Sequence, residues 1–256
     1  MLGQDPHSLA FRCNVCGALT SALPAQLTRE GASCGGCGSS VRQRAVVRLL
    51  SLGLFGESLA IGDFPLRPDL VVLDLSGAEI YARRLAGKLG YVNTFLHREP
   101  RLDIAAPDPS WLGRCDALVS SDVFEHVAPP VAAAFTSALR LLRPGGLLVL
   151  TVPFTRDGPH AEHFPELHDF RIAEEDGRRV LFNRTADGRR QRFGDLVFHG
   201  GEGRTLEMRV FSRASLLAHL AEAGFAETAL HPEPEPRSGI LWHHDWSVPA
   251  TARRPL

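Results

Sequence analysis

Short apolar segments alternate with amphipathic ones along the middle of this 256-residue chain, and this alternation limits the possible folds more than any other feature. Apolar runs with the length of strands lie at 70–75, 91–96, 116–120 and 147–152, with a shorter one at 102–104. Segments with helical spacing separate them, at 79–89 and 131–142. Strands that are apolar throughout and separated by helices favour a parallel sheet covered on both faces. The sequence therefore predicts a Rossmann-like, doubly wound, mostly parallel α/β sheet with its ligand at the carboxyl ends of the strands.

The alternation breaks after the fifth strand. Residues 153–204 are rich in Gly, His and Arg and contain an expected hairpin at 179–193, so we expect an insertion or lid there. Residues 199–203 would form a flexible part of this lid. Regular structure then resumes with a helix at 212–223, a strand at 225–230 and a last apolar segment near 240–248.

Four of the five cysteines form two matched pairs, Cys13 with Cys16 and Cys34 with Cys37, and seventeen residues separate the pairs. Four thiolates at this spacing complete the tetrahedral shell of a structural zinc ion, which leaves no position for a reactive water. A redox pair or disulfides are the alternative, which a reducing compartment disfavours. Cys115 lies in an apolar run and is expected to be a buried free thiol.

These segments divide the chain into a zinc ribbon at 1–40, a linker helix and loop at 41–69, and an α/β domain at 70–256 with its insertion at about 153–204. The linker helix is expected at 41–55, where apolar residues recur at helical spacing with arginines between them.

Charge and hydropathy limit the classes of binding partner that the sequence allows. A formal charge of -1 and a pI near 6.8 argue against a dedicated binder of nucleic acid or of an anionic membrane. No stretch approaches the roughly 20 apolar residues of a membrane span, and the first ten residues lack the pattern of a secretory signal. We therefore expect a cytoplasmic protein without a membrane partner, and the oligomeric state stays open.

Three segments carry a resemblance to a known family. Residues 121–127 read SDVFEHV, residues 141–146 read LLRPGG, and residues 148–153 read LVLTVP. Over residues 70–153 the chain resembles class I S-adenosylmethionine-dependent methyltransferases, most of all the broad type-11 group, and 209–225 resembles their later helix and strand. Some members also carry an N-terminal zinc ribbon followed by a basic helix. The resemblance implies a methyltransferase that uses S-adenosylmethionine, with a structural Zn²⁺.

The resemblance also places the cofactor. In this family an acidic residue and the glycine-rich turn after the first strand hold the methionyl part, and Asp74, Ser76, Gly77 and Ala78 occupy that place. Only Gly77 remains of the usual three glycines, although small residues still permit a tight turn. The carboxylate that usually grips the ribose is replaced by Asn93 or its neighbour Thr94.

Two further positions follow from the resemblance. Asp103 resembles the residue that accepts a hydrogen bond from the adenine amino group, with the backbone N–H of Ile104 donating. The segment from Asp122 to His126 follows the fourth strand, where the family places groups near the sulfonium and the acceptor. A neutral His126 can serve as a general base near pH 7, and the alternative is that this segment only caps the next helix.

The segment after the fifth strand is where this family builds its acceptor pocket, and it is rich in histidines and carboxylates. Methyl transfer is an in-line displacement that needs a held acceptor and sometimes a base. His163 or His168 would take the proton, oriented by Glu162 or Asp169. A metal site formed by His160, His163 and His168 is one alternative, which the nearby prolines disfavour, and a polar loop bonded to backbone carbonyls is another.

The leading functional hypothesis is a methyltransferase for a small-molecule acceptor, such as a sugar or a specialised metabolite, with His-assisted deprotonation. One alternative is an RNA methyltransferase that grips its substrate with the ribbon, favoured by Arg42, Arg44 and Arg48 but opposed by the near-neutral charge. The other is a non-catalytic scaffold on a decayed methyltransferase fold, suggested by the missing glycines and ribose carboxylate.

Overall fold

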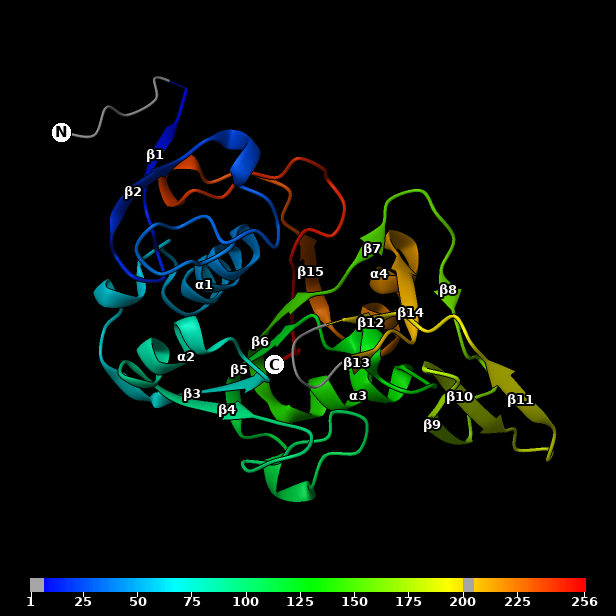
Figure 1. Ribbon diagram of the computed structural model, residues 1–256. Coiled ribbons are helices and arrows are strands. Elements are labelled where there is room, and N and C mark those ends of the chain that lie inside the picture. The colour runs from blue at the N-terminus through cyan, green and yellow to red at the C-terminus, as the bar shows by residue number, and fades with distance from the viewer. Residues whose placement is uncertain (1–6, 200–204) are drawn as a thin grey trace.

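A six-stranded sheet forms the centre of the structure, a computed structural model that describes residues 7–199 and 205–256 (Figure 1). The strands lie in the order β15, β16, β6, β5, β3, β4. Their bounds are β3 Arg67–Leu75, β4 Leu89–Thr94, β5 Cys115–Ser121, β6 Leu142–Thr151, β15 Ala226–Leu230 and β16 Ala250–Arg253. Strands β4, β3, β5 and β6 pair in parallel, and β16 runs antiparallel to both of its neighbours. The predicted Rossmann-like, mostly parallel sheet is confirmed.

Helices cover both faces of this sheet. They are α1 Val41–Phe55, α2 Glu79–Ala86, α3 Ala132–Leu141 and α4 Arg213–Glu222. On one face α1 and α2 pack on residues such as Val72 and Val119. On the other face α3 and α4 pack on residues such as Leu118 and Leu148. The chain is therefore doubly wound, and all four helices were predicted to within a few residues. No helix in the described ranges is long and apolar enough to cross a bilayer.

The last strand lies later in the chain than the last apolar segment expected from the sequence. β16 spans Ala250–Arg253, whereas residues near 240–248 form loops in which Ile240 and Val248 are buried. β16 reads Ala-Thr-Ala-Arg, so it carries no apolar pattern of its own. Its pairing with β6 and β15 makes it a strand.

The ribbon at the N-terminus packs directly on the α/β part. Its hairpin consists of β1 Leu9–Arg12 and β2 Leu19–Ala22. Buried residues of the ribbon, such as Leu27, belong to the same core as buried residues of α1 and of the sheet. In α1, an added Cβ at Gly53 would lie 2.2 Å from a methyl group of Leu147 in β6, so helix and sheet are in close contact. The boundaries at residues 40 and 69 stay predictions.

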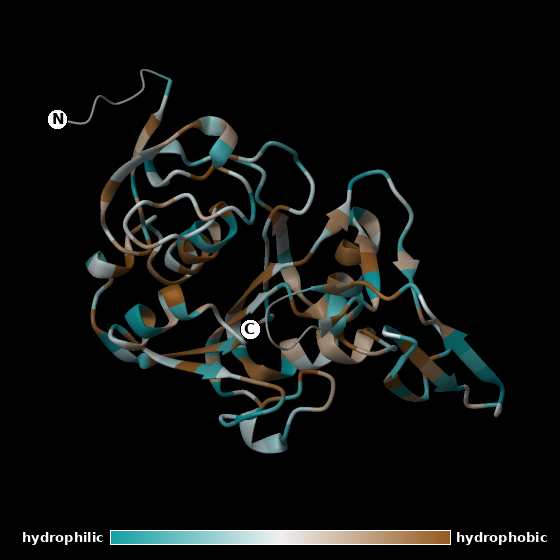
Figure 2. Cartoon of the chain, in the orientation of Figure 1, coloured by the Kyte–Doolittle hydropathy of each residue, from teal (hydrophilic) through white to brown (hydrophobic). Residues whose placement is uncertain are grey.

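Residues 169–193 of the insertion lie at the end of the molecule opposite the ribbon, whereas its later strands lie beside α3 (Figure 1). The insertion contains β7 Phe154–Thr155, β8 Ala161–Glu162, β9 Asp169–Glu175, β10 Arg178–Arg184, β11 Arg190–Phe193, β12 Phe198–His199 and β13 Thr205–Leu206, and it returns to the domain through β14 Arg209–Ser212. Strands β10 and β11 pair antiparallel around the predicted turn, where Gly188 has a φ of +88°. Hydrophobic colouring gathers in the central sheet, while β11 is mainly hydrophilic (Figure 2). Of the predicted flexible lid segment at 199–203, only His199 lies within the described residues.

Candidate functional site

The four paired cysteines converge at one point in the ribbon. Their Sγ atoms all lie within 4.8 Å of one another. The Sγ atoms of Cys13 and Cys37 are 3.8 Å apart, as are those of Cys16 and Cys34. A Zn–S distance of 2.3 Å in a tetrahedral shell places sulfurs about 3.8 Å apart. The donor set therefore fits a closed structural zinc site, and all five cysteines are free thiols rather than disulfides.

Two glycines give the cysteine pairs their matching turns. Gly17 and Gly38 each follow a Cys-x-x-Cys pair and have φ values of +80° and +75°. Their N–H groups donate to the carbonyl oxygens of Cys13 and Cys34, both at 2.7 Å. A left-handed φ favours glycine, which explains why the residue after each pair is glycine. Cys115, outside this group, is buried at the start of β5 as predicted.

Asp74, near the end of β3, is enclosed beneath the turn that follows the strand. It is fully buried, and the Tyr91 hydroxyl donates to its Oδ2 at 2.8 Å. Its Oδ1 has no hydrogen-bond partner among the described residues. Burial raises the pKa of Asp74 to about 7, although the hydrogen bond from Tyr91 acts in the opposite direction. Asp74 therefore supports the turn from below.

Asn93, at the end of β4, holds the same turn from the side. Its Oδ1 accepts from the Gly77 N–H at 2.7 Å, and its Nδ2 donates to the Gly77 carbonyl at 2.9 Å. A Cβ at Gly77 would lie 2.3 Å from Asp74 Oδ2, so only glycine fits here. Ser76 before it has a φ of +58°, and Ala78 after it forms the N-cap of α2. The amide proposed from the sequence to meet the ribose is thus engaged by the turn itself.

Asp103 and Ile104 lie in the loop that follows β4. Phe95 forms a parallel bridge with Arg101, so this loop continues the edge of the sheet without adding a full strand. Ile104 is buried, while Asp103 is half-buried and its Oδ1 accepts from the Ala105 N–H at 2.9 Å. The role of Asp103 toward the adenine stays a prediction.

In a sheet of this topology, the place expected for a ligand lies between the carboxyl ends of β3 and β5, and we call this place the crevice. These strands are neighbours, but α2 follows β3 onto one face and α3 follows β5 onto the other. In such sheets ligands bind where the connections diverge. Each strand is followed by a non-glycine residue in the left-handed region, Ser76 at +58° and Asp122 at +56°. Residues outside glycine adopt this region rarely, and strained positions gather at ligand sites.

Asp122 is held by cations from two other elements. Arg29 of the ribbon binds it with both terminal nitrogens, at 2.8 and 2.7 Å, and Arg42 of α1 approaches to 3.1 Å. Burial alone would raise the pKa of Asp122, but Arg29 and Arg42 lower it. Sequence reasoning missed Arg29, because it lies between the cysteine pairs, where no motif marks it.

Three histidines gather where the insertion meets the end of β5. His126 Nδ1 is 3.0 Å from the Leu206 carbonyl oxygen, and its ring centroid is 5.8 Å from that of His199. Glu207 Oε2 lies 2.6 Å from His199 Nε2, and Glu207 Oε1 lies 3.0 Å from His163 Nε2. Burial lowers the pKa of His126. The insertion thus links His126 and His163 through His199, which the sequence assigned only to the lid, and through Glu207, which it did not single out.

The third predicted base, His168, does not join this group. It is exposed just before β9, and its backbone N–H donates to Asn183. His160 also has a different neighbour, with its Nδ1 3.1 Å from the Ser215 hydroxyl. Within the described residues, the four cysteines are the one group of potential ligands close enough to hold an ion. The alternative metal site at His160, His163 and His168 is therefore wrong, because the fold gives the three side chains separate surroundings.

Glu125, beside His126, is a further buried acid that the sequence did not assign. It is 1% exposed, and its Oε2 has no hydrogen-bond partner among the described residues. Burial, together with the nearby charge of Asp122, raises its pKa well above the usual value. Burial therefore favours the protonated form of Glu125.

A pocket of about 380 Å³ opens in the insertion next to the histidines. It is lined by His163, Phe164, Arg192, Phe193, Gly194, Asp195, Val197 and Glu207. His163 and Glu207 belong to both the pocket and the histidine group. Aromatic walls and ionisable groups thus face the same space.

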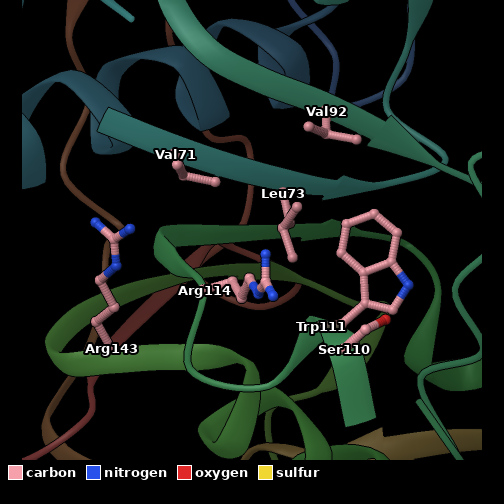
Figure 3. A pocket seen from close by; sticks show the side chains of 7 residues that line it. All are labelled: Val71, Leu73, Val92, Ser110, Trp111, Arg114 and Arg143. Carbon is pink, nitrogen blue, oxygen red and sulfur yellow. The ribbon is translucent and has the colours of Figure 1, made fainter. Parts of the chain in front are cut away.

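A second hollow, of about 420 Å³, lies against one face of β3 and β4 (Figure 3). It is lined by Val71, Leu73, Val92, Ser110, Trp111, Arg114 and Arg143. Arg114 directly precedes β5 and Arg143 lies near the start of β6, so the hollow extends toward the amino ends of these strands. It is therefore separate from the crevice at their carboxyl ends.

The strand order and the helices on both faces define a Rossmann-like α/β protein. The family model described as "Methyltransferase domain" matches residues 64–230. The chain belongs to this methyltransferase family, and it is an S-adenosylmethionine-dependent enzyme.

Several solved methyltransferase structures are similar to the chain at low identity. The 1,6-didemethyltoxoflavin-N1-methyltransferase of Burkholderia thailandensis is 18% identical, with a TM-score of 0.47 over 84% of this chain and 78% of that one. The sugar N-methyltransferase KedS8 from Streptoalloteichus is 16% identical, with a TM-score of 0.48 over 84% and 87%. CalS10, an amino pentose methyltransferase from Micromonospora echinaspora, is 19% identical, with a TM-score of 0.44 over 86% and 93%. No curated protein matches the chain.

Proposed function

We propose that this enzyme transfers the methyl group of S-adenosylmethionine to a small-molecule acceptor, such as a sugar or a specialised metabolite, bound in the pocket of the insertion. The observation that carries the proposal is the continuous group of His126, His199, Glu207 and His163. It joins the carboxyl end of β5 to a pocket of about 380 Å³. Small-molecule sites have volumes of roughly 300–1,000 Å³.

The crevice between β3 and β5 would hold the cofactor. S-adenosylmethionine supplies a methyl group on a sulfonium, which an acceptor attacks in line. The backbone of Ser76, Gly77 and Ala78 borders the crevice and would face the methionyl part, with Asp74 buried below. Asp103 and Ile104 would meet the adenine, as the family resemblance implies. Asp122 would flank the methionyl part, and Asn93 would act by holding Gly77.

His126 is the residue best suited to take a proton from the acceptor. Its Nδ1 lies 3.0 Å from a carbonyl oxygen, which can only accept, so Nδ1 carries the proton of the neutral ring. The other nitrogen, Nε2, then carries the lone pair, and it lies 3.8 Å from Glu125 Oε1. Burial lowers the pKa of His126, which keeps the ring neutral near pH 7 and available as a base. Glu207 would orient His163 and His199 beside the acceptor.

The arginines that favoured an RNA substrate form contacts within the protein instead. Arg44 is fully buried and donates to the Gly239 carbonyl at 2.8 Å. Arg42 binds Glu30 at 2.6 Å, and Arg48 lies 3.7 Å from Glu235. Cations engaged in this way do not offer the free basic surface on which phosphate binding depends. This supports a small-molecule acceptor over RNA.

We propose structural Zn²⁺ for the ribbon, because four thiolates in this geometry suit that ion. Reduced cysteines and a thiolate metal site are typical of the cytoplasm, where we place the enzyme.

Calorimetric titration of the zinc-loaded protein with S-adenosylmethionine and S-adenosylhomocysteine tests the cofactor site. We expect binding that Asp103→Ala weakens. A wild-type protein that binds neither ligand would favour the scaffold alternative, in which the fold has lost its cofactor.

The base is tested after an acceptor has been found by screening, beginning with sugars. His126→Gln should lower kcat by about 10²-fold or more, as expected for loss of a general base, while S-adenosylhomocysteine binding stays unchanged. A variant that retains wild-type kcat would exclude His126 as the base.

A further inference from the structure

The ribbon reaches the cofactor crevice through one arginine. Arg29 lies in the spacer between the two cysteine pairs, yet its guanidinium binds both carboxylate oxygens of Asp122, at 2.7 and 2.8 Å. Its Nε donates to the Ser247 carbonyl at 2.9 Å. All three guanidinium nitrogens of Arg29 are therefore engaged, which fixes the side chain in one position.

Arg42 in the first turn of α1 completes the contact. Its Nε lies 3.1 Å from Asp122, and its Nε and Nη2 donate to Glu30 at 2.8 and 2.6 Å. Its backbone N–H also donates to the Arg29 carbonyl at 3.1 Å. The ribbon loop at 29–30 is thus tied to the start of α1 as well as to Asp122.

The charges of this group balance, and its members are largely shielded from water. Arg29 and Arg42 face Asp122 and Glu30, and the side chains of Arg29, Arg42 and Asp122 are only 20%, 17% and 21% exposed. Charge-assisted, bidentate contacts of an arginine with a carboxylate are the strong and geometrically specific kind. Because these contacts are partly buried, water and salt screen them less than they screen an ion pair on the surface.

Asp122 needs such support because its backbone is strained. Its φ of +56° is unfavourable for a non-glycine residue and costs about 1–3 kcal/mol. Its carboxylate also accepts from the Thr151 hydroxyl at 2.9 Å, and its N–H donates to the Thr151 carbonyl at 2.9 Å. Two elements outside the sheet therefore help hold the turn that ends β5.

We propose that Arg29 is a positioning residue of the cofactor crevice, so that metal binding in the ribbon and cofactor binding at the sheet edge are coupled. This inference rests on the cofactor site proposed above. The turn at Asp122 borders the crevice, and the ribbon fold sets the place of Arg29. A structural metal at Cys34, five residues after Arg29, holds one end of the loop that carries it. Coupling of this kind is reciprocal: the cofactor should tighten metal binding by the same factor as the metal tightens cofactor binding.

The test compares Arg29→Ala with Arg12→Ala in the zinc-loaded full-length protein. Arg12 is a matched control, because it is also a ribbon arginine bound to a carboxylate, but its pair with Asp63 is on the surface, where the two side chains are 51% and 45% exposed. Calorimetry with S-adenosylhomocysteine should show about tenfold weaker binding for Arg29→Ala and a change below about twofold for Arg12→Ala. Arg29→Lys keeps the charge but loses the two-pronged contact, so it should recover only part of the affinity.

Two readouts separate positioning from a general loss of stability. Hydrogen exchange should become faster at the Asp122 amide in Arg29→Ala, while amides in the centre of β3 remain protected. Competition with a zinc chelator measures the zinc affinity. In the wild type, S-adenosylhomocysteine should raise this affinity by the factor by which zinc raises the affinity for S-adenosylhomocysteine. Arg29→Ala should abolish this effect.

Each outcome decides the proposal. The coupling would be overturned if Arg29→Ala bound S-adenosylhomocysteine as tightly as the wild type. It would also be overturned if S-adenosylhomocysteine left the zinc affinity of the wild type unchanged. Either result would leave the proposed function in place. A wild-type protein that binds no S-adenosylhomocysteine would overturn the cofactor site and the coupling together.

Discussion

Asp74 gives this protein a pH-dependent stability that an isosteric substitution should remove. Burial raises the pKa of its carboxyl to about 7, whereas the pKa of an aspartate in an unfolded chain is about 3.9. Because the folded state has the higher pKa, it favours the protonated carboxyl, and the contribution to stability declines as the pH rises from about 4 to about 7. At about 1.36 kcal/mol per pH unit, the full effect is about 4 kcal/mol, of which about 2.5 kcal/mol is lost between pH 5 and pH 8.

Urea unfolding of the zinc-loaded wild type and of Asp74→Asn over this pH range measures the effect. Asparagine keeps an oxygen that accepts from Tyr91 but carries no charge. Other titrating groups, such as Glu125, are present in both proteins and cancel in the difference. We expect the variant to gain about 2.5 kcal/mol relative to the wild type between pH 5 and pH 8. A difference that stays constant with pH would mean that Asp74 is ionised throughout, and it would refute the reasoning from burial.

Three further perturbations have defined outcomes. Gly77→Ala places a Cβ 2.3 Å from Asp74 Oδ2, so it should weaken S-adenosylhomocysteine binding in calorimetry by more than about tenfold, whereas Gly62→Ala meets no atom within 4 Å and should bind normally. Arg44→Met leaves buried acceptors unpaired and should lower the free energy of urea unfolding by about 3 kcal/mol, against less than about 0.5 kcal/mol for the exposed Arg84→Met. Chelation of the ribbon metal should lower the melting temperature measured by calorimetry and open the ribbon to proteolysis, and a chelated protein with an unchanged melting temperature would contradict a structural metal.

The sequence predicts the elements that carry their own pattern. The centre of β5, residues 117–119, is apolar. Helix α1 begins after Ser40, which accepts from the Gln43 N–H, and ends at Gly56 with a φ of +76°. β16 lacks such a pattern, because its side chains are short and not consistently apolar. It is buried by its position between β6 and β15. Local signals therefore define the parallel core, while long-range pairing defines its last strand.

The candidate site divides in the same way. The cysteine spacing alone predicts the cluster in the ribbon, since all four donors lie in two short turns. Arg29 and Asp122 are 93 residues apart, and no local pattern pairs them. The arginines of α1 show the converse. Their spacing in the sequence indicates a basic surface, but in the structure Arg44 is buried and Arg42 forms ion pairs with Glu30 and Asp122. Contacts between distant segments, which create both arrangements, are not encoded by spacing.

Asn93 yields a prediction that runs against the family resemblance. A carboxylate usually stands at this place to grip the ribose, so Asn93→Asp would restore the family residue. In this chain, however, Asn93 Nδ2 donates to the Gly77 carbonyl at 2.9 Å while Oδ1 accepts from the Gly77 N–H at 2.7 Å. Aspartate can accept but not donate, so it would place an anionic oxygen against that carbonyl.

The loss of this donor should cost about 1–3 kcal/mol and loosen the strained turn at Ser76, whose N–H donates to the Thr94 carbonyl at 2.8 Å. We therefore expect Asn93→Asp to bind S-adenosylhomocysteine more weakly than the wild type and to unfold at lower urea concentration. Tighter binding by Asn93→Asp would instead mean that the side chain leaves Gly77 for the ribose. The glycine-poor turn would then have to be stable without Asn93, held by Ser76 and by the buried Asp74 alone.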